Sequence, residues 1–128
     1  MKLTLIALTV AATMFVSSAF AADPDDLQKL KDTGECVGCD LSGANLQNAV
    51  LADANLIWAN LQNADLTGAN LRGAYLNGAN LFGAELNGAD LSGAKLIKTD
   101  LSGADLSEAT LSGTDLSGAD LKRAVCLN

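Results

Sequence analysis

Histidine is absent from the 128-residue sequence, and aromatic residues make up only 4% of it. The absence of histidine removes the commonest general base, the commonest metal ligand and the usual pH-sensitive side chain. With so few aromatic residues, the interior has to be built from small and medium aliphatic side chains. A globule packed with leucine and alanine alone specifies a unique core poorly, whereas stacked repeats fix their register through neighbouring units. The composition therefore favours a repeat architecture.

Basic residues are also scarce, because 8 lysines and arginines stand against 15 acidic residues, for a net charge of −7. This balance argues against binding to nucleic acid through its phosphates, which requires a basic surface. A net negative charge also keeps a regular β-structure soluble and monomeric. The length leaves room for one domain.

Leucine recurs at every fifth position from Leu41 to Leu121. The residue two positions before each leucine is small: it is Cys39 in the first repeat, Thr99 and Thr114 in two others, and alanine elsewhere. A helix would spread leucines of this spacing around its whole circumference, and a strand would place them on alternating sides. The period instead predicts a chain that turns a corner every five residues, with the leucine and the small residue both pointing inward.

Glycine closes most of these repeats and supplies the positive φ that a type II turn requires. Four such corners close a square coil of about twenty residues. The unit resembles that of the pentapeptide repeat proteins, A(D/N)LxX, from Cys39 to Val125. The resemblance implies an all-β fold, a right-handed quadrilateral β-helix of about four coils with four repeats in each. It also implies that the other three positions of each repeat face solvent.

The first residues of the chain are typical of a secretory signal. Lys2 provides a positive start, residues 3–16 form an apolar run, and Ala19-Phe20-Ala21 is a small-x-small cleavage site. The apolar run is too short to be a permanent anchor, so no membrane span is expected after signal removal. We therefore expect an exported protein, and the resemblance to small exported pentapeptide repeat proteins points to the periplasm or the thylakoid lumen. Disulfides can form in such compartments.

A short helix is expected between the signal and the repeats. Asp23 suits the N-cap position, Pro24 the first helical position, and Gly34 the left-handed residue that ends a helix. Leu27 and Leu30 share one face, which would cover the open first coil as a cap. The alternative is an unstructured leader. The expected organisation is a signal peptide in 1–21, the capping helix and Cys-x-x-Cys entry in 22–38, and the β-helix in 39–128.

The Cys36-Val37-Gly38-Cys39 segment lies in register with the repeat, because Cys36 holds a leucine position and Cys39 a small-residue position. Both sulfurs should then face inward near the same corner. A structural disulfide would join the cap to the first coil, with a modest entropic effect because the loop is small. Two reduced buried thiols and a redox-active pair are the alternatives. Two thiolates without histidine leave a tetrahedral metal site half empty, so neither a metal nor a cofactor is expected.

Outward-facing positions twenty residues apart should stack in columns, so the sides of the coil can be compared. The side of Leu56, Leu76 and Leu96 holds the only tryptophan and the only tyrosine. Clustered exposed apolar and aromatic groups are typical of partner-binding surfaces. Alternatively, these large side chains only cover a corner at which Trp58 and Lys98 replace glycine. The predicted partner-binding patch consists of Ile57, Trp58, Tyr75, Lys95, Ile97 and Lys98.

Two further features of the repeats lie outside this patch. Asp40, Asn60, Asn80, Asp100 and Asp120 form a column whose side chains can cap turns or bond to neighbouring coils. At the other end of the chain, Cys126 holds a leucine position. Val125, Cys126 and Leu127 are predicted to form the interface of a possible homodimer. The alternative is that nearby basic residues blunt this edge.

A filled prism offers no pocket where catalytic groups converge, so an enzyme is not expected. The leading hypothesis is a structural or scaffolding protein whose rigid surface binds an unidentified protein partner, and no nucleic acid. The family resemblance also implies an alternative, an acidic DNA mimic that inhibits a nucleic-acid-binding enzyme. A third hypothesis is a thiol–disulfide redox partner that acts through Cys36 and Cys39.

Overall fold

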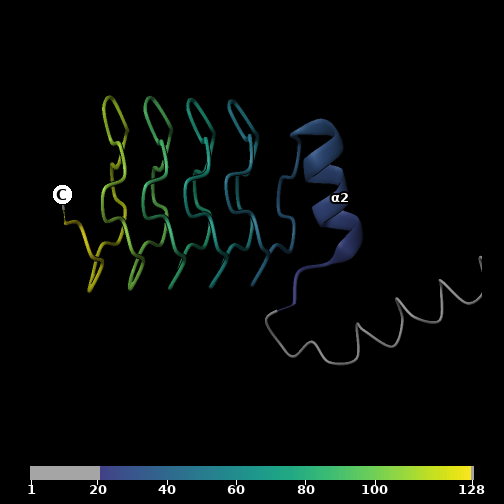
Figure 1. The fold of residues 1–128 in the computed structure, drawn as a ribbon, viewed down its shortest axis with the longest axis horizontal. Helices are drawn as coiled ribbons and strands as arrows, with labels where there is room; N and C mark the ends of the chain where they lie inside the picture. The colour runs from purple at the N-terminus through teal and green to yellow at the C-terminus, as the bar shows by residue number, and fades with distance from the viewer. Residues whose placement is uncertain (1–20, 128) are drawn as a thin grey trace, which may run out of the picture.

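The computed structural model describes residues 21–127, so the predicted signal peptide lies outside the described residues except for Ala21. Helix α2 (Pro24–Thr33) comes first, and a coiled segment of repeats follows. Figure 1 shows the helix packed against one end of a stack of coils, with the C-terminus at the opposite end.

Helix α2 begins and ends at the residues that the sequence predicts. The Asp23 carboxylate accepts the N–H of Asp25 at 2.9 Å, and Pro24 holds the first helical position. Gly34 ends the helix with a φ of 71°, and its N–H donates to the carbonyl of Leu30. Leu30 is buried in the core of the first coil, and Leu27 packs against that core. A helix therefore lies over the first coil, at the position where the sequence predicts a cap.

One residue of each repeat pairs in parallel with the residue twenty positions further along the chain. The Leu41 N–H donates to the carbonyl of Asn60 at 2.7 Å, and the Asn60 N–H donates back to the carbonyl of Cys39 at 2.8 Å. The chain turns directly after each leucine, as shown by the 3.1 Å hydrogen bond from the Ala44 N–H to the Leu41 carbonyl. Each coil therefore contains four turns and four paired sides.

The β-structure of this coil consists of single bridges. Each side contributes one bridging residue per coil, because the chain turns again before a longer strand can form. No extended strand occurs between residues 21 and 127. The expected all-β class is thus seen as ladders of isolated bridges with one helix at the end.

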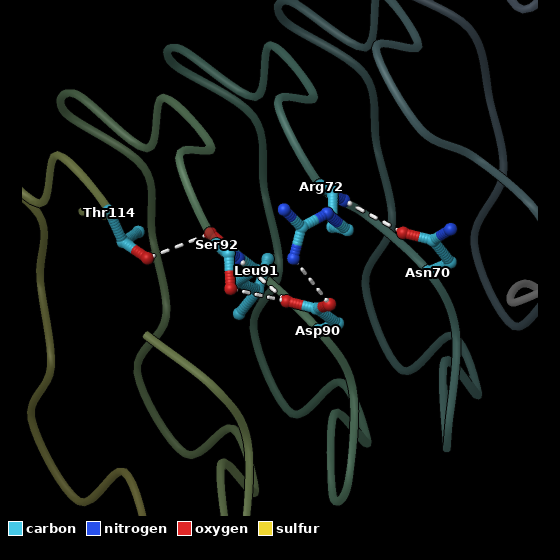
Figure 2. Close-up of polar contacts among 6 residues, drawn as sticks. All are labelled: Asn70, Arg72, Asp90, Leu91, Ser92 and Thr114. Carbon is cyan, nitrogen blue, oxygen red and sulfur yellow. Dashed lines mark hydrogen bonds and ion pairs between the residues drawn. The ribbon is translucent and has the colours of Figure 1, made fainter. Parts of the chain in front are cut away.

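The core is a column of leucines lined by alanines, and almost all of them are fully buried between Leu41 and Leu106. Threonine replaces alanine at two inward positions along the coil, and both hydroxyls have hydrogen-bond partners. The Thr99 hydroxyl donates to the Leu76 carbonyl at 2.7 Å, and the Thr114 hydroxyl donates to the Leu91 carbonyl at 2.8 Å (Figure 2). Both acceptors lie in the preceding coil, so the hydroxyls link adjacent coils.

Candidate protein-interaction face

The residue before each leucine has a local structural role when it is aspartate or asparagine. Figure 2 shows the Asn70 side-chain oxygen accepting the Arg72 N–H at 3.1 Å, and the Asp90 carboxylate accepting the Ser92 N–H at 3.0 Å. This Asx turn satisfies an amide at the corner of the coil. The same contact is made by Asp40, Asn45, Asn55, Asn60, Asp65, Asn80, Asp100, Asp105, Asp115 and Asp120. The predicted column from Asp40 to Asp120 therefore caps turns.

The last residue of each repeat has a left-handed backbone. Glycine accepts this conformation without strain, and asparagine and aspartate tolerate it better than other residues. Trp58 and Lys98 adopt it too, with φ values of 60° and 57°. A large side chain at this corner lies over the next coil: a Cβ atom built on Gly78 would stand 2.5 Å from Cζ3 of the Trp58 ring.

Four departures from these two local rules lie on one side of the coil, and the remaining ones are spread over the other three sides: Val50, Glu85, Glu108, Thr110 and Arg123. Tyr75 and Lys95 pair in the same ladder as Asn55, at the position where an Asx residue would cap the turn. Trp58 and Lys98 occupy corners of this same side, where glycine would be unstrained. An Asx hydrogen bond contributes about 1 kcal/mol and a left-handed residue other than glycine costs about 1–2 kcal/mol. Local stability therefore does not explain why these four residues are present.

The structure brings the six predicted patch residues together as one surface, which we call the lysine–aromatic face: Ile57, Trp58, Tyr75, Lys95, Ile97 and Lys98. Trp58 is 67% exposed, and Tyr75 is also exposed. Ile57 and Ile97 are half-buried. They lie in the coils on either side of Asn77, as shown by two hydrogen bonds: the Trp58 N–H donates to the Asn77 carbonyl, and the Gly78 N–H donates to the Ile97 carbonyl.

The sequence-based prediction missed two members of this surface. Val37 is exposed and adjoins Ile57, because the Gly38 N–H donates to the Ile57 carbonyl at 2.9 Å. The twenty-residue spacing of Val37 and Ile57 was the signal that could have revealed it. Asn77 carries a buried side-chain oxygen without a hydrogen-bond partner among the described residues. No sequence signal indicates that feature, because the burial of a single atom depends on how its neighbours pack.

The charges of the molecule are unevenly distributed over its sides. The lysine–aromatic face contains two basic residues, Lys95 and Lys98. On the same side, hydrogen bonds from the Ser117 hydroxyl and amide lower the pKa of Asp115, and the charge of Lys95 lowers it further. A different side contains the acidic residues Asp65, Glu85, Asp105 and Glu108. Hydrogen bonds from the Gln47 and Thr67 side chains lower the pKa of Asp65, and the Ser107 hydroxyl and amide lower the pKa of Asp105. Both carboxylates are thus charged at neutral pH.

The predicted cysteine pair lies below helix α2. Cys36 and Cys39 are joined by a disulfide with a Cα–Cα distance of 5.2 Å, and both residues are buried. The sulfur of Cys36 lies 3.3 Å from the carbonyl oxygen of Asp26 in the helix. The disulfide therefore belongs to the contact between the cap and the first coil. Cys126, the third cysteine, is exposed and forms no disulfide in the described part of the chain.

Between residues 21 and 127, no group of three or more histidine, cysteine, aspartate or glutamate side chains could hold a metal ion. No helix in this range is long and apolar enough to cross a membrane. A depression of about 410 Å³ lies on the acidic side and is lined by Thr67, Gly68, Asn87, Gly88, Asp105, Ser107 and Glu108.

Three solved structures are similar to most of this chain. A pentapeptide repeat protein from the Arabidopsis thaliana thylakoid lumen is 30% identical, with a TM-score of 0.65, and the match covers 71% of this chain and 61% of that one. The protein Rfr23 from the cyanobacterium Cyanothece 51142 is 26% identical, with a TM-score of 0.65 over 80% of this chain and 97% of that one. A pentapeptide repeat protein from Nostoc PCC 7120 is 36% identical, with a TM-score of 0.62 over 81% of this chain and 79% of that one.

No curated protein matches the sequence. The family model for pentapeptide repeats matches residues 35–73, 59–96 and 84–123, and it finds eight copies of its unit. These matches begin at Glu35, the residue at which ladder pairing also begins in the structure. The matched repeats, the twenty-residue pairing and the similar solved structures agree, and the chain belongs to the pentapeptide repeat family.

Proposed function

We propose that this protein is a non-enzymatic scaffold that binds a protein partner through its lysine–aromatic face, carried on a right-handed quadrilateral β-helix. The observation that carries the proposal is the clustering of Trp58, Tyr75, Lys95 and Lys98 at positions where the local structure favours other residues. Side chains that reduce local stability are expected where function requires them. Aromatic residues with adjacent apolar groups are also typical of the energetically important centre of an interface.

The partner is expected to be a protein in an exported compartment. Export is supported by the signal features of residues 1–21 and by the Cys36–Cys39 disulfide, which oxidising compartments favour. A similar protein, 30% identical, comes from a thylakoid lumen. These observations support the periplasm or the thylakoid lumen as the location in which to search for the partner.

Burial of the disulfide argues against the alternative of a redox partner. Thiol–disulfide exchange requires an attacking thiolate to reach a sulfur atom. Cys36 is 0% and Cys39 4% exposed, so helix α2 would have to move before either sulfur could be attacked. A scaffold stabilised by its disulfide agrees better with this geometry.

Affinity capture from the source compartment tests the proposed face. The double variant Trp58→Ser/Ile97→Ser removes the largest exposed ring and a half-buried aliphatic group. Phe82→Ser is the matched control, because Phe82 is an exposed aromatic residue on a different side of the coil. The wild type and the control should capture the same partner, and the double variant should lose it while its thermal unfolding remains cooperative. Crosslinks to the partner should involve Lys95 or Lys98. Unchanged capture by the double variant would refute the proposal.

A further inference from the structure

The backbone of the first coil has an edge that no earlier coil covers. In the interior of the stack, the residue before each leucine forms two backbone hydrogen bonds with the preceding coil. Asn60 is an example, since its N–H donates to Cys39 and its carbonyl accepts from Leu41. The first coil has helix α2 in this place instead. A helix has no regular array of free donors and acceptors along its side, so it cannot pair with all four sides of a coil.

Helix α2 and its flanking residues satisfy two of the four sides. The Asp40 carbonyl accepts the Asp23 N–H at 3.0 Å, and the Asp40 N–H donates to the Asp26 carboxylate at 2.8 Å. The Glu35 N–H donates to the Thr33 hydroxyl oxygen at 3.0 Å. These contacts hold the cap against the Glu35 and Asp40 sides of the coil.

The two remaining sides are those of Asn45 and Val50. Within the described range, the backbone N–H and carbonyl groups of both residues lack hydrogen-bond partners. Val50 occupies a position where an Asx residue would cap the turn, and it is 81% exposed, more than any other large hydrophobic residue between residues 21 and 127. An unpaired edge with an exposed β-branched residue is a template for an additional extended segment.

A groove follows this unpaired edge between helix α2 and the coil. Its volume is about 380 Å³ and its lining consists of Lys31, Asn45, Leu46, Gln47, Ala49, Val50 and Leu51. Leu46 and Leu51 are already buried, so the core is closed beneath the groove. Lys31 is the only charged residue of the lining, and it forms no ion pair with another described residue.

We propose that this groove binds an extended segment of a partner protein that carries one carboxylate opposite Lys31 and pairs with the backbone of Asn45 and Val50. Pairing by main-chain hydrogen bonds is the recognised mode by which a peptide adds to an exposed sheet edge. Val50 provides an apolar contact for one side chain of the segment, and Lys31 selects a carboxylate. The site is separate from the lysine–aromatic face, since it lies at the capped end, on the sides of Asn45 and Val50.

Amide NMR of the isotope-labelled protein with its disulfide intact tests this proposal. The probe is the peptide Val-Thr-Val-Glu-Val with both ends blocked, and its twin carries glutamine in place of glutamate. The glutamate peptide should shift the amide signals of Asn45, Gln47 and Val50 and slow hydrogen exchange at Asn45 and Val50. Because Lys31 is exposed, the glutamine twin should bind about two- to fivefold more weakly.

Three variants separate backbone pairing from adventitious binding. Val50→Asp restores an Asx cap at this corner and places a negative charge on the edge, so it should abolish binding of the glutamate peptide. Lys31→Gln should remove the preference for glutamate over glutamine. Lys29→Gln, on the same helix but outside the groove, should leave both affinities unchanged.

Three outcomes would overturn the proposal. The first is the absence of shifts at Asn45 and Val50 at millimolar peptide concentrations, and the second is an equal response of Lys31→Gln and Lys29→Gln. The third is a concentration-dependent shift of these amides without peptide, which would identify a second copy of this chain as the occupant. None of these outcomes bears on the lysine–aromatic face, because its capture experiment uses different residues.

Discussion

Trp58 shows how one residue restricts the residue at the same corner of the next coil. Its ring lies over Gly78, in the space that a side chain at that position would fill. The side chains of Asn48, Asp53 and Asn63 lie in the same way over a glycine twenty residues further on. A glycine in this fold thus meets two separate requirements, a left-handed backbone and room for the side chain of the preceding coil.

A pair of alanine substitutions separates these two requirements. Gly78 and Gly88 have similar φ values of 67° and 70°, but a Cβ atom on Gly88 would meet nothing within 4 Å. Gly88→Ala should cost about 1–2 kcal/mol through its backbone conformation alone. Gly78→Ala should cost about 1–3 kcal/mol more because of the clash with Trp58. Urea unfolding measures both changes, and the difference should disappear in a Trp58→Gly background, where no side chain lies over residue 78. Equal losses in the wild-type background would contradict the steric account.

The lowered carboxylate pKa values predict a loss of stability in acid. The Ser107 hydroxyl donates to the Asp105 carboxylate at 2.5 Å and holds its pKa below the ordinary value. A group whose pKa is lower in the folded state stabilises the fold above its unfolded pKa, and this contribution is lost as pH falls through the folded pKa. Ser107→Ala should therefore raise the pKa of Asp105 and weaken the acid dependence of the free energy of unfolding. NMR titration of the carboxyl groups measures this, with Asp65 as the unaffected control; an unchanged Asp105 would refute it.

At the scale of elements, helix α2 and the first coil form one unit held together by polar contacts, Leu30 and the buried disulfide. Each coil of a solenoid interacts only with its neighbours, so damage at the cap should remain local. The later coils pair with one another independently of these contacts.

Removal of the disulfide tests this local character. Because Cys36 and Cys39 are separated by 3 positions, the loop they close is short, and loop-closure entropy predicts a loss of about 2 kcal/mol for Cys36→Ala/Cys39→Ala. Amide exchange should accelerate in α2 and in the first coil while the later coils remain protected. Cys126→Ala, at an exposed position, is the control. Uniform acceleration along the whole chain would contradict a local effect.

The sequence predicted the features that depend on local chemistry. Asp23 and Gly34 marked the ends of the helix correctly, and the leucine period placed the core, because caps and inward positions follow from nearby residues. The contact of Asp26 with Asp40 was not predictable, since it depends on how the helix docks. The open edge at Val50 was missed for the same reason. The columns of the lysine–aromatic face were predictable because pairing at a spacing of twenty follows from the repeat.

At the scale of the whole molecule, the two ends of the stack differ. Helix α2 covers the first coil, whereas the last described coil is more open: Leu121 is 40% exposed, although the leucines in the middle of the stack are completely buried. Val125 and Leu127 are exposed beside it, and so is Cys126. An exposed apolar patch of this kind is a site of association.

We propose that this end forms a two-fold dimer through Val125, Cys126 and Leu127. Sedimentation velocity should show a concentration-dependent dimer of the folded protein. If Cys126 links the subunits, reductant or Cys126→Ser should weaken the dimer, while Leu127→Asp should abolish it. A monomer both with and without reductant would end this hypothesis.

The pairing of residues at a spacing of twenty, with a turn every five residues, also determines what insertions and deletions do. Deletion of one complete coil shortens the rod and leaves every downstream side chain on its original side. Deletion of a single repeat preserves the leucine core equally well but turns the downstream surface by one quarter of a revolution. If the deleted repeat lies between Trp58 and Lys95, these two residues lie on adjacent sides. A family built on this coil can thus rearrange its surface by losing or gaining five residues, while leucine still stacks on leucine and alanine on alanine in the core.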